Sequence, residues 1–207
     1  MNWCKKYEIS LKDYILRDVR DESSGLRFKY YINKLDPSLA VTTSGTIGTQ
    51  NYFIEYTKNG KMHREGNLPA RVEIENGKLK NVIYCVNGKL HKENGPCSYR
   101  VAYGTTRVFW CIDNKFCRFD GPAYIVRNLE TNEIEEEAYY LYDFRMKKEE
   151  YNKLIQNVKN CNMKMVNCKT NELKLERILL TAKHFNSEKL VEKCTSLLIA
   201  KKLTKQH

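Results

Sequence analysis

The sequence predicts an α+β protein in which an antiparallel β-hairpin repeat meander precedes a small C-terminal helical bundle. The same turn residues recur through the middle of the chain, with 28 residues from His63 to His91 and 26 from His91 to Cys117. Tyrosine, which suits half-buried strand surfaces, occurs 14 times. With 42% hydrophobic and 29% charged residues, the composition is that of a folded chain.

Residues 1–50 are expected to form a small irregular or α/β lead-in that packs on the first repeat. Within them, residues 28–32 fit a strand and residues 42–49 fit a loop. The opening segment has no long apolar core or small-residue cleavage site, so we expect no signal peptide and no membrane span. The expected location is cytoplasmic, and the eight cysteines are then expected to be reduced.

Residues 51–146 are predicted to be the repeat array. Copies begin at Tyr56, Tyr84 and Trp110, and a truncated fourth copy begins at Tyr140. Each copy should form one hairpin, in which an aromatic strand leads into a tight turn and a second strand follows a proline. We assign structural roles in the repeats to Asn59, Gly60, His63, Pro69, Asn87, Gly88, His91, Gly95, Pro96, Trp110, Gly121 and Pro122.

The pattern aromatic-x-x-Asn-Gly-Lys-x-His-Arg-x-x-Gly-Pro-Ala resembles the MORN-like hairpin repeat of large DNA viruses and tailed phages. The first two copies follow it well, whereas the third has Asp113-Asn114 for Asn-Gly and Cys117 for the histidine. The resemblance covers residues 52–151 and implies contacts with proteins or membrane surfaces, without catalysis. It also suggests a viral structural or accessory protein, in the virion or in the host cytoplasm.

Residues 147–207 are predicted to be a basic helical region. From Arg145 onward, 13 Lys and 2 Arg face 6 Glu, so this tail carries most of the net charge of +11. Asn186 is expected to cap the last helix. The apolar residues at helical spacing are Tyr151, Leu154, Ile155 and Val158, then Leu173, Ile178, Leu179 and Ala182, then Leu190, Cys194, Leu197 and Leu198.

The last two of these helices resemble the terminal helix pair of BTB/POZ domains. The resemblance rests on Leu179, Leu180, Ala182 and Phe185, followed by Leu190 and a cysteine four residues later. The sheet that precedes these helices in BTB domains is not recognisable in this sequence. A generic helical hairpin therefore remains the alternative interpretation.

No catalytic triad, phosphate-binding loop, dinucleotide fingerprint or paired CxxC motif is visible, so we expect no enzyme and no cofactor. His63 and His91 occupy the same repeat position, which favours a structural role for both, in pairing with neighbouring backbone or carboxylate groups. Mixed His and Cys ligands can hold zinc. The one candidate set is His91, Cys97, Cys111 and Cys117, and its spacing matches no common zinc motif.

The favoured function is a non-enzymatic scaffold for protein–protein interaction. One alternative is a nucleic-acid-binding protein acting through the basic tail, and another is a ubiquitin-ligase adaptor if the BTB-like helices are real. Basic residues that recur near the turns could form a ridge along one edge. Acidic residues in the same turns, Glu65, Glu93 and Asp120, weaken that interpretation. The partner-binding candidates are Lys61, Arg64, Lys89, Lys92, Lys115, Arg118, Leu190 and Leu197.

Overall fold

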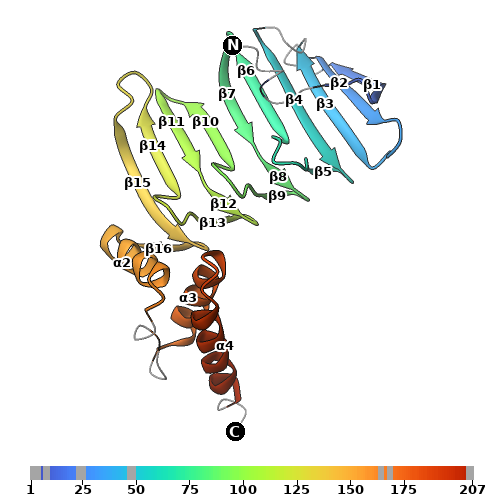
Figure 1. Ribbon diagram of the computed structural model, residues 1–207. Helices are drawn as coiled ribbons and strands as arrows, with labels where there is room; N and C mark the ends of the chain where they lie inside the picture. The colour runs from blue at the N-terminus through green and yellow to red at the C-terminus, as the bar shows by residue number, and fades with distance from the viewer. Residues whose placement is uncertain are drawn as a thin grey trace. The chain divides into compact units, whose positions relative to one another are not determined.

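The computed structural model describes residues 6, 10–21, 27–45, 50–162, 166 and 170–203. In these residues an antiparallel strand meander is followed by three helices, which confirms the predicted α+β class (Figure 1). The chain divides into two compact units. The sheet unit comprises Met1–Phe116 and Ala123–Glu137, and the helical unit comprises Cys117–Pro122 and Ala138–His207.

Strands that are neighbours in sequence pair in space along the main sheet. Their order is β1-β2-β3-β4-β6-β7-β10-β11-β14-β15-β16, with β5 paired to β4. The bounds are β1 (Tyr14–Asp21), β2 (Arg27–Asn33), β3 (Leu39–Gly45), β4 (Tyr52–Lys58), β5 (Lys61–Met62), β6 (Arg71–Glu75), β7 (Lys78–Ile83), β10 (Ser98–Ala102), β11 (Thr105–Phe109), β14 (Tyr124–Asn128), β15 (Ile134–Leu141) and β16 (Phe144–Met146).

Each central repeat contains two hairpins, whereas the sequence predicted one. Two-residue hairpins, β8 (Cys85–Val86) with β9 (Lys89–Leu90) and β12 (Cys111–Ile112) with β13 (Lys115–Phe116), form ladders separate from the main sheet. Tyr84 shows why the long strand stops. Its N–H donates to the carbonyl of Cys97 in the main sheet, while its own carbonyl accepts from the N–H of His91 in the short hairpin. The chain therefore changes partner at the aromatic residue.

The lead-in extends the main sheet in its described part. Strand β2 contains the strand expected at 28–32, but β3 overturns the predicted loop for residues 42–45, while residues 46–49 lie outside the described part. Residues 42–45 pair with β4, and Thr43 lies directly opposite Ile54. Pairing with a long apolar strand therefore outweighs their turn-like composition.

The tight turns have both central residues at positive φ, the type I′ geometry that matches strand twist. Asn59 and Gly60 have φ of 50° and 71°, and Asn87 and Gly88 have 51° and 77°. The third and fourth copies hold the same geometry without glycine, at Asp113-Asn114 and Tyr142-Asp143. The turn position is thus kept along the array even where the residues favouring it are lost.

One face of the sheet carries a continuous row of side chains across the repeats. Residues directly opposite each other in antiparallel strands share a face, and the printed registers link one residue of each strand to the next. This apolar row is Ile54, Val72, Val82, Tyr99, Val108 and Ile125. Its first three members are at most 2% exposed and belong to the core of the sheet unit.

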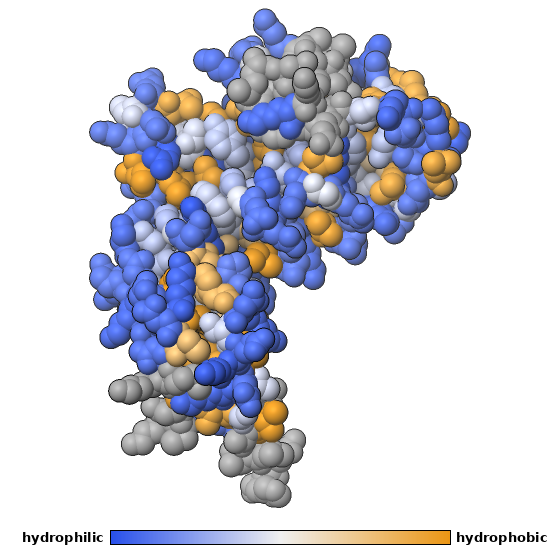
Figure 2. Space-filling view, viewed as in Figure 1, coloured by the Kyte–Doolittle hydropathy of each residue, from blue (hydrophilic) through white to orange (hydrophobic). Residues whose placement is uncertain are grey.

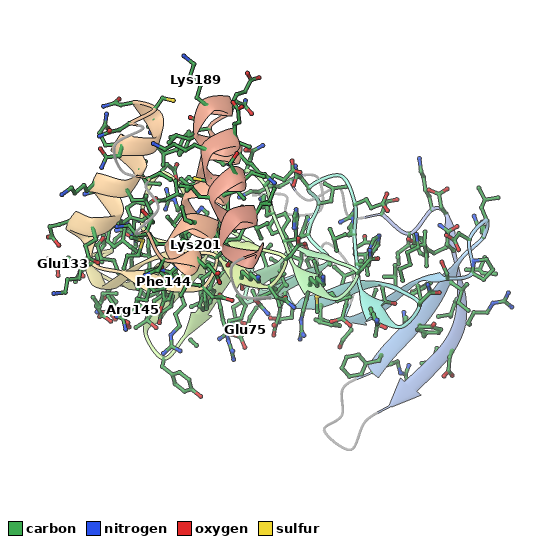
Figure 3. All side chains as sticks on the ribbon, turned by 90° about the horizontal axis from the view of Figure 1, so that it is seen from below. Glu75, Glu133, Phe144, Arg145, Lys189 and Lys201 are labelled. Carbon is green, nitrogen blue, oxygen red and sulfur yellow. The ribbon has the colours of Figure 1, made fainter. Side chains whose placement is uncertain are left out.

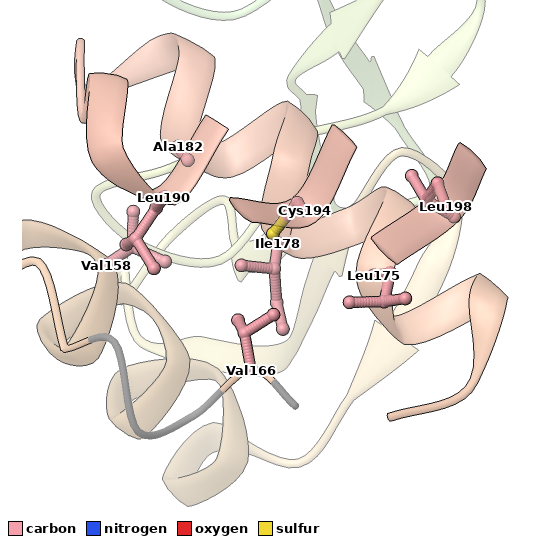
Figure 4. Close-up of a cluster of buried hydrophobic side chains, with 8 residues drawn as sticks. All are labelled: Val158, Val166, Leu175, Ile178, Ala182, Leu190, Cys194 and Leu198. Atoms are coloured by element: carbon pink, nitrogen blue, oxygen red, sulfur yellow. The ribbon is translucent and has the colours of Figure 1, made fainter. Parts of the chain in front are cut away.

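The helical unit packs α2 (Lys148–Lys159), α3 (Glu172–His184) and α4 (Glu188–Leu203) around a second apolar core (Figure 4). Its buried members are Val158, Val166, Leu175, Ile178, Ala182, Leu190, Cys194 and Leu198. No helix in the described residues is long and apolar enough to cross a membrane.

Two details of the predicted helices are wrong. Leu175 faces the core in place of Leu173, which is 58% exposed. Asn186 does not cap α4. It lies just after α3 with φ of 53°, where its N–H donates to the carbonyl of Lys183 and the N–H of Ser187 donates to that of Ala182. This is a Schellman ending, in which asparagine takes the left-handed position usually given to glycine.

Candidate functional site

The repeated histidine links one repeat to the next. Nδ1 of His63 accepts a hydrogen bond of 3.0 Å from the backbone N–H of Asn87, the first residue of the next turn. Since Nδ1 accepts, the neutral ring carries its proton on Nε2, which lies 3.4 Å from a Glu65 carboxylate oxygen. His63 is only 5% exposed, so its ring nitrogens are engaged in holding the turn.

His91 occupies the same position one repeat later but is held less firmly. Its Nδ1 lies 3.4 Å from the N–H of Asp113 and 3.1 Å from a carboxylate oxygen of the same residue. One nitrogen cannot accept from the N–H and donate to the carboxylate at the same time, so these contacts compete. The backbone link is nevertheless repeated, because Gly88 N–H donates to the Met62 carbonyl and Asn114 N–H donates to the Leu90 carbonyl.

The predicted basic ridge separates into two kinds of residue. Arg64 and Lys92 turn back over the rings of Tyr56 and Tyr84, at 4.0 and 3.5 Å from the ring centroids. Arg118, in the helical unit, bonds Asp120 and the carbonyl of Pro122, and its ion pair lowers the pKa of Asp120. The remaining three lysines are exposed and directly follow the tight turns of successive repeats: Lys61, Lys89 and Lys115. None has an ion pair with a described residue.

Three lysines surround a groove of about 680 Å³ on the face of the sheet that carries the apolar row. Leu79 and Val82 of β7 and Val101 of β10 contribute aliphatic side chains. The half-buried rings of Tyr84 and Tyr99 lie beside them, and burial raises the pKa of Tyr99. The volume is within the range of pockets that take small ligands or a few side chains.

The rim of the groove is positively charged. Lys6, Lys78 and Lys92 line it, and no acidic side chain of the described residues does. The ammonium of Lys80, two residues from Lys78, is paired with Glu75 at 2.7 Å, whereas the side chain of Lys78 has no ion pair or hydrogen bond with the described residues. Leu129, which is 48% exposed, completes the lining with an apolar side chain at the surface. The arrangement suits a ligand that is both apolar and anionic.

The opposite face of the same strands holds an unfavourable charge pair. Arg100 and Arg107 lie directly opposite each other on β10 and β11, and both are exposed. Neither guanidinium has a hydrogen bond or an ion pair with the residues that the structure describes. Figure 2 shows hydrophobic residues interspersed with hydrophilic ones over the visible surface of the sheet unit, without a single broad apolar patch.

Cys85, Cys97 and Cys111 of the sheet unit are buried thiols. Cys97 hydrogen-bonds Cys111, and this bond together with burial raises the pKa of Cys97. Burial also raises the pKa of Cys85 to about 11. Of the candidate zinc set, the structure brings together Cys97 and Cys111. Among the described residues, no three His, Cys, Asp or Glu side chains are placed so that they could hold a metal ion.

The helical unit presents lysines rather than a leucine surface. Lys153, Lys174, Lys183 and Lys189 are exposed and form no ion pair with any described residue; Figure 3 labels Lys189, near one end of α4. Leu190 is fully buried in the helical core, because α4 turns it toward α2 and α3. It therefore has no surface to offer a partner, and Leu197 is only partly buried.

The remaining repeat residues lie at turns or strand joins. Pro69 is buried and Pro96 lines the groove. The backbone N–H of Trp110 donates to the carbonyl of Ala123 where the strand changes partner. Gly95 has φ of 110°, and the N–H of Gly121 donates to the hydroxyl of Tyr151. The sequence did not single out the groove residues Leu79, Val101 and Leu129, since no local motif marks them.

The fold and the site define a protein of β-hairpin repeats followed by a helical unit, with a groove in the sheet unit that has apolar walls and lysines at its edge. Comparisons of the chain with protein-family models, curated proteins and solved structures find no match.

Proposed function

We propose that this chain is a non-enzymatic scaffold whose sheet unit binds another protein through the groove beside Val82 and Tyr99. The groove is the observation that carries this proposal, because it combines apolar side chains from two neighbouring strands with a charged rim. Protein-binding surfaces share this composition, with an apolar centre and a polar edge. The MORN-like pattern of the repeats supports the same role.

The bonding between repeats also favours a scaffold. His63 and His91 each use Nδ1 to contact the backbone of the next turn, and this repeated contact supports a structural role for both. Each repeat bonds the next through backbone groups as well, so the floor of the groove is held by neighbours on both sides. A preorganised surface loses less conformational entropy when a partner binds.

The test is affinity purification with the full chain after nuclease treatment, followed by quantitative mass spectrometry. Leu129→Asp places a charge on the rim of the groove. Leu35→Asp is the matched control, since Leu35 is 94% exposed and does not line the groove. We expect a set of proteins that is retained by native protein and by the Leu35 variant and is lost with Leu129→Asp. Equal recovery with both variants would contradict binding at the groove.

Nucleic-acid binding through the helical unit is the second candidate. The observation that favours it is the set of exposed lysines without ion pairs on α2, α3 and α4. Contacts of lysine with phosphates make affinity fall steeply with salt. We therefore expect, on this hypothesis, that Lys174→Glu and Lys183→Glu weaken binding to a labelled oligonucleotide and reduce its salt dependence, whereas Lys61→Glu in the sheet unit changes neither.

A further inference from the structure

We propose that the groove recognises an acidic protein segment, with an apolar side chain of that segment against Leu79, Val82 and Val101 and its carboxylates against the rim lysines. This inference rests on the proposed function and names the chemistry of the partner.

The charge of the rim selects the partner. Lys6, Lys78 and Lys92 line the groove, and no carboxylate of the described residues lies among them. Glu75 could have neutralised Lys78, its cross-strand neighbour, but pairs with Lys80 instead. Lysines gathered at a groove that no carboxylate of the described residues lines attract an anionic ligand and repel a basic one.

The floor of the groove distinguishes a peptide from a nucleic acid. Single strands bind where bases stack on exposed aromatic faces. Here the Lys92 ammonium already lies 3.5 Å from the centroid of the Tyr84 ring, and aliphatic side chains cover much of the floor. An aliphatic or aromatic side chain fits such a surface, and the protonated Tyr99 hydroxyl can donate to a carboxylate or a carbonyl oxygen of the partner.

Lys78 offers a well-matched experiment because its local sequence occurs elsewhere in the sheet. Lys78 follows Asn76-Gly77, and Lys89 follows Asn87-Gly88. Both lysines are exposed, both follow type I′ turns, and neither has an ion pair with a described residue. Only Lys78 lines the groove. Lys78→Glu and Lys89→Glu therefore make the same change of charge in the same local setting.

The probe is a short fluorescein-labelled peptide in which glutamate alternates with phenylalanine, measured by fluorescence anisotropy with the full chain. We expect Lys78→Glu to weaken its binding about tenfold and Lys89→Glu to leave it within about twofold. A peptide with lysine in place of glutamate should bind at least about tenfold more weakly than the acidic one. Circular dichroism of each variant checks that it remains folded.

Three outcomes would overturn the inference: no binding of the acidic peptide, equal binding of the basic peptide, or an equal effect of the two lysine variants. Stronger binding of an oligothymidylate probe that Lys78→Glu abolishes would assign the groove to nucleic acid instead. If Leu129→Asp still loses its protein partners while the acidic peptide fails to bind, the proposed function stands and only the acidic specificity fails. If neither Leu129→Asp nor Lys78→Glu changes binding, the proposed function and the acidic specificity both fail.

Discussion

The two units of this chain are stabilised in different ways. In the sheet unit, bonds run from one repeat to the next, as from His63 to Asn87 and from Gly88 to Met62. In the helical unit, three helices share one cluster of buried side chains. Repeat arrays distribute stability over contacts between neighbours, whereas a single small core concentrates it. A substitution in the helical core should therefore have a larger effect than one at a repeat junction.

The largest effect is expected for Leu190→Ala. Leu190 is fully buried, and a buried leucine truncated to alanine typically costs about 2–5 kcal/mol of unfolding free energy. Urea denaturation followed by far-UV circular dichroism measures it through the helical signal. Leu173→Ala is the control, because Leu173 is 58% exposed and should change stability by about 0.5 kcal/mol or less. Equal effects of the two would contradict the core described for this unit.

A smaller effect is expected for His63→Ala. The substitution leaves the N–H of Asn87 without its acceptor, at a cost of about 1–3 kcal/mol. His91→Ala should cost less, since His91 is more exposed and its bond to the N–H of Asp113 is longer at 3.4 Å. Thermal denaturation measures both. A larger loss for His91→Ala would show that the first junction is not the firmer one.

Alkaline pH should weaken the sheet unit through its thiols. Burial raises the pKa of Cys85 from 9.0 to about 11, so the folded state keeps this thiol neutral where the unfolded chain ionises it. The contribution of Cys85 to stability is complete below pH 9 and is lost as pH rises toward 11. Urea midpoints measured across this window should fall less steeply for Cys85→Ala. An unchanged slope would show that this thiol is not the group responsible.

The smallest effect is a gain in stability. Arg100 and Arg107 face each other across two strands, and like charges in this position are unfavourable. Arg107→Thr removes the repulsion and places a strand-favouring residue there, so we expect an increase of about 0.2–1 kcal/mol. The increase should shrink at high salt, as screening weakens the repulsion in the native protein. A loss of stability would indicate that Arg107 makes a stabilising contact, with Arg100 or another neighbour, that outweighs the charge repulsion.

The sequence was most informative where structure is local. Asn59-Gly60 and Asn87-Gly88 predicted their turns because positive φ is a property of those residues. It failed at Leu173, which was grouped with Ile178 and Ala182. Leu175 lies three and seven residues before these two, the spacing of a single helix face, and it is the residue that is buried. Strands β1 to β3 were missed or only partly predicted because the repeat signature does not extend to them.

The groove could not have been predicted in this way. Val82 and Val101 line it from β7 and β10, and Leu129 from a turn well beyond both in the sequence. Their proximity depends on the register between strands, which no single repeat specifies. Of the lysines that line the groove, only Lys92 was among the recurring basic residues of the repeats. The distinction between Lys78 and Lys80 requires the ion pair of Lys80 with Glu75.

The pairing of strands within each repeat has a consequence for how such a gene can change. The first and second repeats, which begin at Tyr56 and Tyr84, each add two strands to the main sheet, β6 with β7 and β10 with β11. Recombination that duplicates or deletes one repeat therefore alters the strand number by two and leaves every remaining side chain on its original face. Copy number can vary by whole repeats, each lengthening the array by about 10 Å, while the inward and outward surfaces keep their chemistry.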